Sequence, residues 1–199
     1  MNQASAVTRA EFLRGAIAGG SVLLLAGVPL LASRPGAAGA VQSAEMDKEI
    51  LNFALLLEYL EDGFYSEALE SGALSGELLK FAEEVGRHEA AHVELLQDAL
   101  GSDARSRPTF DFGPAVSDPE EFLSAAVLLE ETGTAAYIGQ GANLSSAMAV
   151  TAGRIASVEA RHTAWIRDIA GRHPAPHAAD PSMTKKEVSA AIRKTGFLS

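Results

Sequence analysis

Two copies of one short motif constrain the fold of this chain more than any other feature. Glu-x-x-His occurs at Glu89 to His92 and again at Glu159 to His162. Residues three apart share one helical face, so each copy presents a carboxylate and an imidazole to one point. A single copy is weak support for a metal site, because such pairs also occur as solvated pairs or as satisfied core histidines. The repetition, however, calls for a structural explanation.

Companion residues make the repeated motif specific. Six residues separate Glu58 from Tyr65, and six separate Glu130 from Tyr137. The glutamate of the next Glu-x-x-His motif follows Glu58 by 31 residues and follows Glu130 by 29. The chain is therefore a doubled helix pair, with its polar residues near the middle of each helix. Whichever way the helices run, these side chains meet at one level.

Apolar residues at helical spacing predict an all-α fold with four long helices and one short helix. The expected helices cover about 45–71, from the turn at 71–76 to Gly101, from Asp118–Pro119 to the glycines at 139 and 141, about 145–170, and about 184–194. Residues 101–119 lack a period and contain three prolines, so they predict one long crossover between helices 2 and 3. We expect a four-helix bundle over 45–172 and a tail with a short helix over 173–199.

The N-terminal residues 1–40 have the layout of a bacterial export signal. A charged stretch precedes an apolar run from Ala16 to Ala32, and small residues follow at 38–40. Thr8 to Arg14 is similar to a twin-arginine (Tat) signal in which the second arginine is replaced by Ala10. The route, twin-arginine or general secretory, and cleavage stay open; an uncleaved segment would be a membrane anchor. We expect export to the periplasm or the exterior of a bacterium.

Charge and cysteine content exclude several kinds of function. The net charge is -10, so binding to nucleic acid is disfavoured, and contact with a membrane is expected only through an uncleaved N-terminus. The chain has no cysteine, which excludes disulfides, iron–sulfur clusters and thiolate-bound zinc. Any metal must bind to oxygen and imidazole ligands.

The glutamates and histidines on the apolar faces of the expected helices predict a dinuclear metal site. Isolated carboxylates in a core cost more than the net stability of a small domain, about 5 to 15 kcal/mol. Two Fe or Mn ions would resolve this conflict, whereas zinc prefers fewer ligands and calcium avoids imidazole. The candidate ligands are Glu58, Glu89, His92, Glu130, Glu159 and His162.

From residue 51 onward the sequence resembles the ferritin-like superfamily, and in particular its exported, desiccation-related branch. The resemblance rests on residues 52–61, 88–93, 129–137 and 158–162. It implies that Glu89 and Glu159 bridge two metal ions. It further implies that Glu58 and His92 complete one coordination shell and that Glu130 and His162 complete the other.

Some assignments within these motifs stay open at this stage. Glu61 and Glu131 lie close to Glu58 and Glu130 in the sequence and could replace them as ligands or support them. Tyr65 and Tyr137 are candidate catalytic residues, which would donate hydrogen bonds to bound oxygen species or pass electrons, or they are simply core aromatics. We expect no ion to be bound by His88, His173 and His177.

Two functions compete on this basis. The first is a redox enzyme of ferroxidase, peroxidase or catalase type, whose small partner is O₂ or peroxide. The second is a non-catalytic stress or desiccation-related protein, in which the metal stabilises the bundle. An iron-storage cage is a weaker third. The native metal, the substrate and the oligomeric state stay open, with a homodimer as one candidate.

Overall fold

A computed structural model describes residues 44–198 of the chain. The expected export segment, 1–40, lies outside the described residues. The helices are α2 (Ala44–Ser71), α3 (Gly76–Leu100), α4 (Pro119–Gly141), α5 (Ser146–Ile169) and α6 (Lys185–Thr195). Over the described range there is no strand, only one isolated bridge between Phe110 and Leu198. The predicted all-α class is confirmed.

Helix ends follow the capping residues in the sequence. The Asp118 side chain accepts hydrogen bonds from the backbone N–H groups of Glu120 and Glu121 at the start of α4. At the start of α6, Thr184 and Glu187 form a reciprocal capping box. These two caps explain why both helices begin where the sequence indicates.

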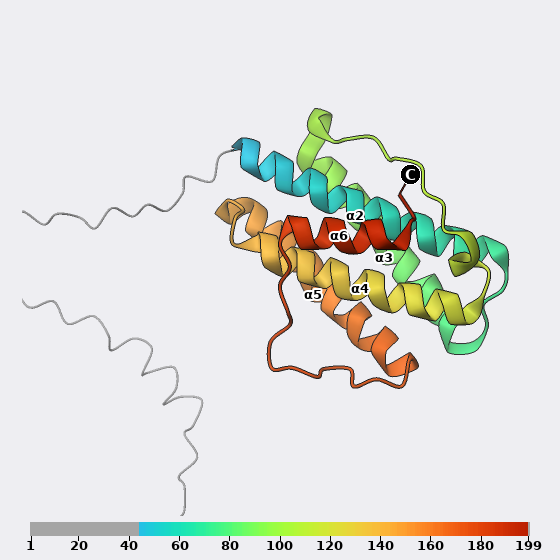
Figure 1. Cartoon of the computed structure of the whole chain (residues 1–199). Coiled ribbons are helices and arrows are strands. Elements are labelled where there is room, and N and C mark those ends of the chain that lie inside the picture. The colour runs from blue at the N-terminus through green and yellow to red at the C-terminus, as the bar shows by residue number, and fades with distance from the viewer. Residues whose placement is uncertain (1–43, 199) are drawn as a thin grey trace, which may run out of the picture. The chain divides into compact units, whose positions relative to one another are not determined.

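The four long helices form two hairpins that pack together (Figure 1). α2 packs mainly against α3 and α4 against α5, while smaller contacts join α2 to α4 and α3 to α5. The crossover leaves the end of α3 and returns along the bundle to the start of α4. The short helix α6 packs on α4. This is the expected four-helix bundle with one long crossover and a short C-terminal helix.

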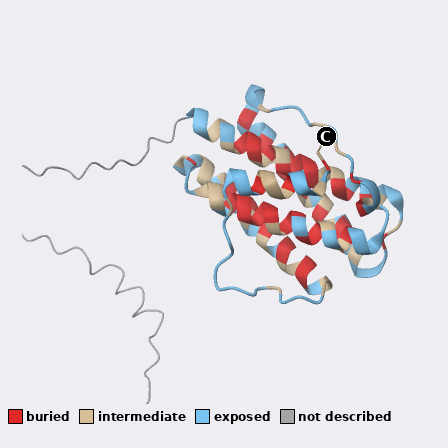
Figure 2. Cartoon of the chain, viewed as in Figure 1, coloured by how far each residue is buried: buried red, intermediate tan, exposed pale blue. Residues whose placement is uncertain are grey.

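Buried residues line the facing sides of the helices (Figure 2) and divide into two clusters. Along α3 the cluster rich in aromatic rings ends at Val85, and the largely aliphatic cluster begins at Val93. Glu89 and His92 lie between these two points and are themselves buried. A belt of polar side chains therefore crosses the middle of an otherwise apolar interior.

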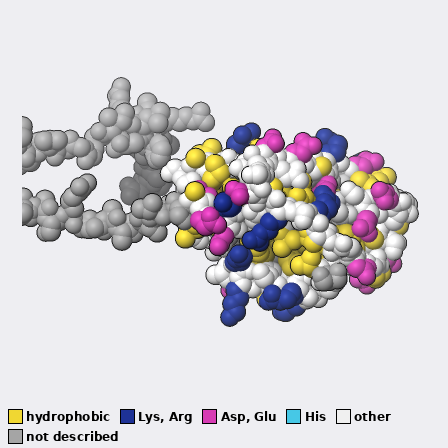
Figure 3. Space-filling model, turned by 90° about the horizontal axis from the view of Figure 1, so that it is seen from above, with side chains coloured by type: hydrophobic (Ala, Val, Ile, Leu, Met, Phe, Trp, Pro, Cys, Tyr) yellow, Lys and Arg dark blue, Asp and Glu magenta, His cyan; other side chains and the backbone are white. Residues whose placement is uncertain are grey.

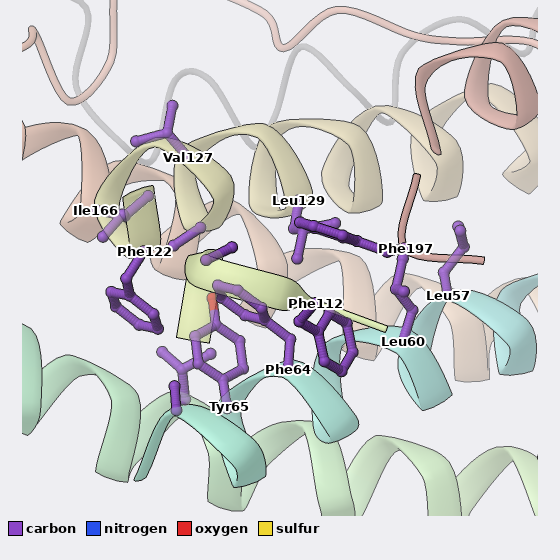
Figure 4. Packing of buried hydrophobic residues seen from close by; sticks show 14 of the residues in the cluster. Leu57, Leu60, Phe64, Tyr65, Phe112, Phe122, Val127, Leu129, Ile166 and Phe197 are labelled. Carbon is purple, nitrogen blue, oxygen red and sulfur yellow. The ribbon is translucent and has the colours of Figure 1, made fainter. Parts of the chain in front are cut away.

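The crossover contributes more to the core than its sequence suggests. It contains two short 3-10 helices, η1 (Gly101–Asp103) and η2 (Gly113–Val116). The ring of Phe112 is buried against Phe64 and Phe197, with centroids 5.6 Å and 5.2 Å away (Figure 4). The backbone N–H of Asp111 also donates to the Phe197 carbonyl, 3.0 Å away. The crossover and the C-terminus thus close one side of the aromatic cluster together.

The surface seen in Figure 3 carries both signs of charge. Lys and Arg side chains lie beside Asp and Glu side chains on this face, with apolar side chains between them. Within residues 44–198, none of the helices is both long enough and apolar enough to span a membrane.

Candidate metal centre

The six predicted ligands come together inside the bundle. Each of the four long helices contributes from near its middle, and the side chains are buried: the four glutamates are 0% exposed, His92 8% and His162 3%. The helical pattern brings them there, because each acid or histidine takes a position in the stripe that faces the other helices.

The donor atoms divide into two groups that share two carboxylates. Within each group, one ligand atom from every residue lies within 4.8 Å of the others. The groups are Glu58, Glu89, His92 and Glu159, and Glu89, Glu130, Glu159 and His162. The shared carboxylates, Glu89 and Glu159, belong to the two Glu-x-x-His motifs on α3 and α5. Two donor groups that share carboxylates are compatible with a metal site.

Both histidines turn the same ring nitrogen inward. His92 Nδ1 lies 3.1 Å from Glu89 Oε2 and 3.2 Å from Glu159 Oε1. His162 Nδ1 lies 3.1 Å from the other oxygen of Glu89, Oε1. Glu89 therefore offers one oxygen to each histidine, as a bridging carboxylate would.

The two tyrosines hold the two unshared carboxylates from across the bundle. Tyr137 of α4 donates a hydrogen bond to Oε1 of Glu58 on α2, and Tyr65 of α2 donates one to Oε1 of Glu130 on α4. The Oε2 atom of each glutamate has no hydrogen-bond partner and lies 3.2 Å from His92 Nδ1 or 3.5 Å from His162 Nδ1. Each tyrosine thus fixes one oxygen and leaves the other facing the centre.

Burial keeps these tyrosines protonated. It raises the pKa of Tyr65 well above its ordinary value, and the Glu130 carboxylate raises it further. Burial and the Glu58 carboxylate do the same to the pKa of Tyr137. Both hydroxyls therefore remain hydrogen-bond donors. The tyrosines are therefore more than apolar packing residues, because each hydroxyl is bonded to a carboxylate. A catalytic role for them stays a prediction.

Unpaired polar atoms show that the donor set fits cations. Among the described residues, six buried side-chain atoms lack a hydrogen-bond partner: Glu58 Oε2, Glu89 Oε1, Glu130 Oε2, both Glu159 oxygens and His162 Nδ1. All six belong to the two groups. Leaving buried carboxylates unpaired costs several kcal/mol each, and oxygen with imidazole donors suits divalent iron or manganese. The cluster is compatible with a metal site.

Without cations, protons must offset the charge. Burial raises the pKa of Glu159 to about 7, although His92 opposes the shift. Burial and the Glu159 carboxylate raise the pKa of Glu89. Burial lowers the pKa of His92, but contacts with Glu159, Glu58 and Glu89 outweigh burial, and the net shift is upward. Protons and cations therefore compete for the same atoms.

The structure separates the neighbouring acids that sequence alone left open. Glu131 points away from the centre, and its Oε1 accepts a hydrogen bond from Arg167 Nε at 2.8 Å. Glu130, next to it, lies in the centre. Glu61 is only 2% exposed, yet it belongs to neither donor group. Glu58 and Glu130 thus occupy the expected positions, and Glu61 is an additional buried acid.

His88 belongs to neither donor group but has a role that sequence reasoning missed. Its Nδ1 atom lies 2.8 Å from His162 Nε2, and the two rings stack with centroids 5.1 Å apart. On its other side, His88 Nε2 lies 3.4 Å from Glu84 Oε1. The sequence carried no signal for this contact, because it joins α3 to α5. His173 and His177 lie exposed in the tail.

A pocket of about 310 Å³ reaches the centre between α3 and α5. His92 and His162 form part of its wall, and the rest of the lining comes from Glu84, His88, Ala91, Val158, Arg161 and Trp165. Trp165 also packs edge-on against Phe81, with centroids 5.2 Å apart. The outer edges of both candidate imidazole ligands are therefore next to a solvent-sized opening.

Comparison with known proteins agrees with this architecture. A family model described as a ferritin-like domain matches residues 46–172, which span the four long helices up to the end of α5. Among curated proteins, no sequence matches the chain. The match covers more than half of the chain, and the chain therefore belongs to the ferritin-like domain family.

Proposed function

We propose that this chain is an exported, desiccation-related ferritin-like protein that holds two Fe or Mn ions for redox chemistry with O₂ or peroxide. One observation carries the proposal: six buried donor atoms without hydrogen-bond partners, all in two groups that share Glu89 and Glu159. Such atoms are costly in a core unless cations bind them.

Charge and ligand type support two ions of this kind. Four carboxylates balance two divalent cations, while each imidazole, neutral when bound through Nδ1, adds no charge. The set of oxygens with two imidazoles suits iron or manganese better than zinc or calcium. Glu58 and His92 would hold one ion, Glu130 and His162 the other, and the shared carboxylates would hold both.

The protein's own residues prepare the site before any ion arrives. The hydroxyls of Tyr65 and Tyr137 fix the carboxylates of Glu130 and Glu58 and stay protonated. When bound, the ions supply one-electron redox chemistry at oxygen. The surrounding aromatic and aliphatic clusters limit contact with bulk water, and the pocket of about 310 Å³ beside His162 has room for small molecules such as O₂ or peroxide.

A second function follows from the same buried atoms. Because unpaired carboxylates destabilise the metal-free bundle, bound ions would stabilise the fold whether or not they turn over. A non-catalytic stress protein in which the ions only stabilise the bundle is therefore the alternative. The experiment below distinguishes it from the redox enzyme.

The test is metal analysis of the full chain purified from its own compartment, followed by peroxidase, catalase and ferroxidase assays. The matched variants are a Glu89→Ala, Glu159→Ala double variant and a Glu94→Ala, Asp168→Ala control. The control removes two exposed carboxylates from the same helices. N-terminal sequencing of the same sample checks the proposed export signal.

We expect about two Fe or Mn ions per chain, lost in the first variant and kept in the control. Turnover of peroxide, Fe(II) or O₂ would support the redox enzyme. Bound metal with raised thermal stability and no turnover would support the structural alternative. A metal-free chain with an unchanged fold would refute both.

A further inference from the structure

Another pocket, of about 350 Å³, lies between α2, the crossover and α6. Its apolar lining includes Phe53, Leu56, Tyr59 and Pro108. None of its lining residues is a candidate metal ligand, so the pocket is separate from the metal centre. Its volume falls in the range of small-molecule sites, about 300 to 1,000 Å³.

Hydrogen bonds from two buried side chains of α2 fix the crossover wall of this pocket. The Asn52 amide donates to the carbonyl of Asp103 at 3.0 Å and accepts from the backbone N–H of Arg105 at 2.8 Å. The Tyr59 hydroxyl donates to the carbonyl of Arg105 at 3.1 Å and accepts from Gln97 Nε2 at 2.8 Å. The wall is therefore preformed, which lowers the entropic cost of binding a ligand.

The charge around this pocket is opposite to that of the whole chain. The chain has 26 Asp and Glu residues against 16 Lys and Arg residues, yet no acid lines the pocket, whereas Arg105 and Lys185 both do. Within residues 44–198, neither of these exposed side chains forms an ion pair, and Lys185 Nζ lies 5.3 Å from the ring centroid of Phe53. The nearby Arg107, by contrast, pairs with Asp62. Two unbalanced positive charges therefore border an apolar pocket.

We propose that this pocket binds a small organic carboxylate with an apolar body. The apolar body packs against Phe53, Leu56 and Tyr59. The carboxylate accepts charge-assisted hydrogen bonds from Arg105 and Lys185. A cationic ligand would meet two like charges, and an uncharged ligand would leave both cations without a partner.

The experiment is calorimetric titration of the full chain with 1-naphthoate and with its uncharged analogue 1-naphthalenemethanol. The salt concentration is about 0.15 M, at which long-range attraction of anions is screened. We expect one site for naphthoate with a dissociation constant of about 1 mM or tighter. The alcohol should bind at least about tenfold more weakly, because it lacks the charge-assisted hydrogen bonds.

Charge variants on the pocket and beside it make the test specific. Arg105→Gln and Lys185→Gln should each lower the affinity for naphthoate about tenfold. Lys186→Gln is the matched control, because it removes the same charge from an exposed position on α6 that does not line the pocket. The affinity of this control should change less than about twofold.

A variant that fills the pocket tests the site by shape. Ser189 of α6 is half-buried and lines the pocket, so Ser189→Trp should abolish naphthoate binding while circular dichroism shows an intact helical fold. Absence of naphthoate binding to the wild-type chain, equal affinity for the acid and the alcohol, or equal losses in Lys185→Gln and Lys186→Gln would each overturn the inference. None of these results depends on bound metal, so they leave the proposed function untouched.

Discussion

The helix pair α2–α3 and the helix pair α4–α5 carry the same ligand types at matching positions but surround them differently. Each pair offers one glutamate, a tyrosine seven residues later and one Glu-x-x-His motif. Around this shared set, Gly133 takes the place that corresponds to Glu61, and Val158 takes the place that corresponds to His88. The repeat supplies the candidate ligands, and the departures from it make the surroundings of the two donor groups unequal.

The largest expected effect distinguishes shared from unshared ligands. Glu159→Gln removes a carboxylate present in both groups, so we expect it to abolish binding of both ions. Glu130→Gln touches one group only and should leave about one ion per chain. Metal content after dialysis, measured together with thermal unfolding, distinguishes the two. Equal losses in the two variants would show that the ions do not bind as two groups.

His88 should matter to one ion only. It is neutral, because burial and the neighbouring His162 lower its pKa. Its Nδ1 can therefore accept the Nε2–H of His162 and leave His162 Nδ1 free to bind. His88→Ala should lower the affinity for one of the two ions by about 10- to 100-fold, as measured in a Mn(II) titration.

Two further variants make the His88 prediction specific. His88→Asn, which keeps an acceptor near the position of Nδ1, should restore most of the affinity. Val158→Ala, at the matching place in the second pair, should have little effect. If His88→Ala lowered the affinity for both ions equally, His88 would act through packing rather than by orienting His162.

The tyrosines offer a test in which the two pairs should agree. Tyr65→Phe and Tyr137→Phe each remove a buried hydrogen bond to a carboxylate, worth about 1.5 to 3 kcal/mol. We expect each variant to lower the affinity for the ion bound by the affected glutamate about tenfold. The loss of affinity should be similar in the two variants. Calorimetric Mn(II) titration would measure this, and a clear effect in one variant only would break the equivalence.

The smallest effect is a difference in pH dependence. Metal binding must displace protons from groups whose pKa values are raised, such as Glu159 at about 7, so affinity should rise from pH 6 to pH 8. His92 Nδ1 lies within 3.2 Å of three carboxylates, whereas His162 Nδ1 is 3.7 Å from Glu159. The ion bound by His92 should therefore show the steeper dependence. Affinity that fell with rising pH would contradict this account.

The sequence predicted the helices well because their boundaries depend on local chemistry. The cap at Asp118 and the capping box at Thr184 both form as expected. The crossover was less predictable, because Phe112 follows no period and is buried only where α2 and the C-terminus meet it.

The centre was predictable where ligand types repeat along one helix, and not where two helices must meet. The contact of His88 with His162 joins α3 to α5, so no spacing within one helix encodes it. The place of Glu61 likewise depends on a missing side chain at Gly133, far away in sequence. Adjacent acids such as Glu130 and Glu131 differ only in helical phase, which the packing of α4 decides.

The crosswise tyrosine bonds also bear on how such a bundle can be divided. Tyr65 of the first pair donates a hydrogen bond to Glu130 of the second pair, and Tyr137 of the second pair donates one to Glu58 of the first. A single hairpin cut from the chain would hold its glutamate without the hydroxyl that fixes it. Two copies of one hairpin related by a twofold axis, however, would satisfy both bonds. The two hairpins of this chain therefore exchange hydrogen bonds as the two halves of a symmetric dimer would. Because they belong to one chain, their sequences can differ.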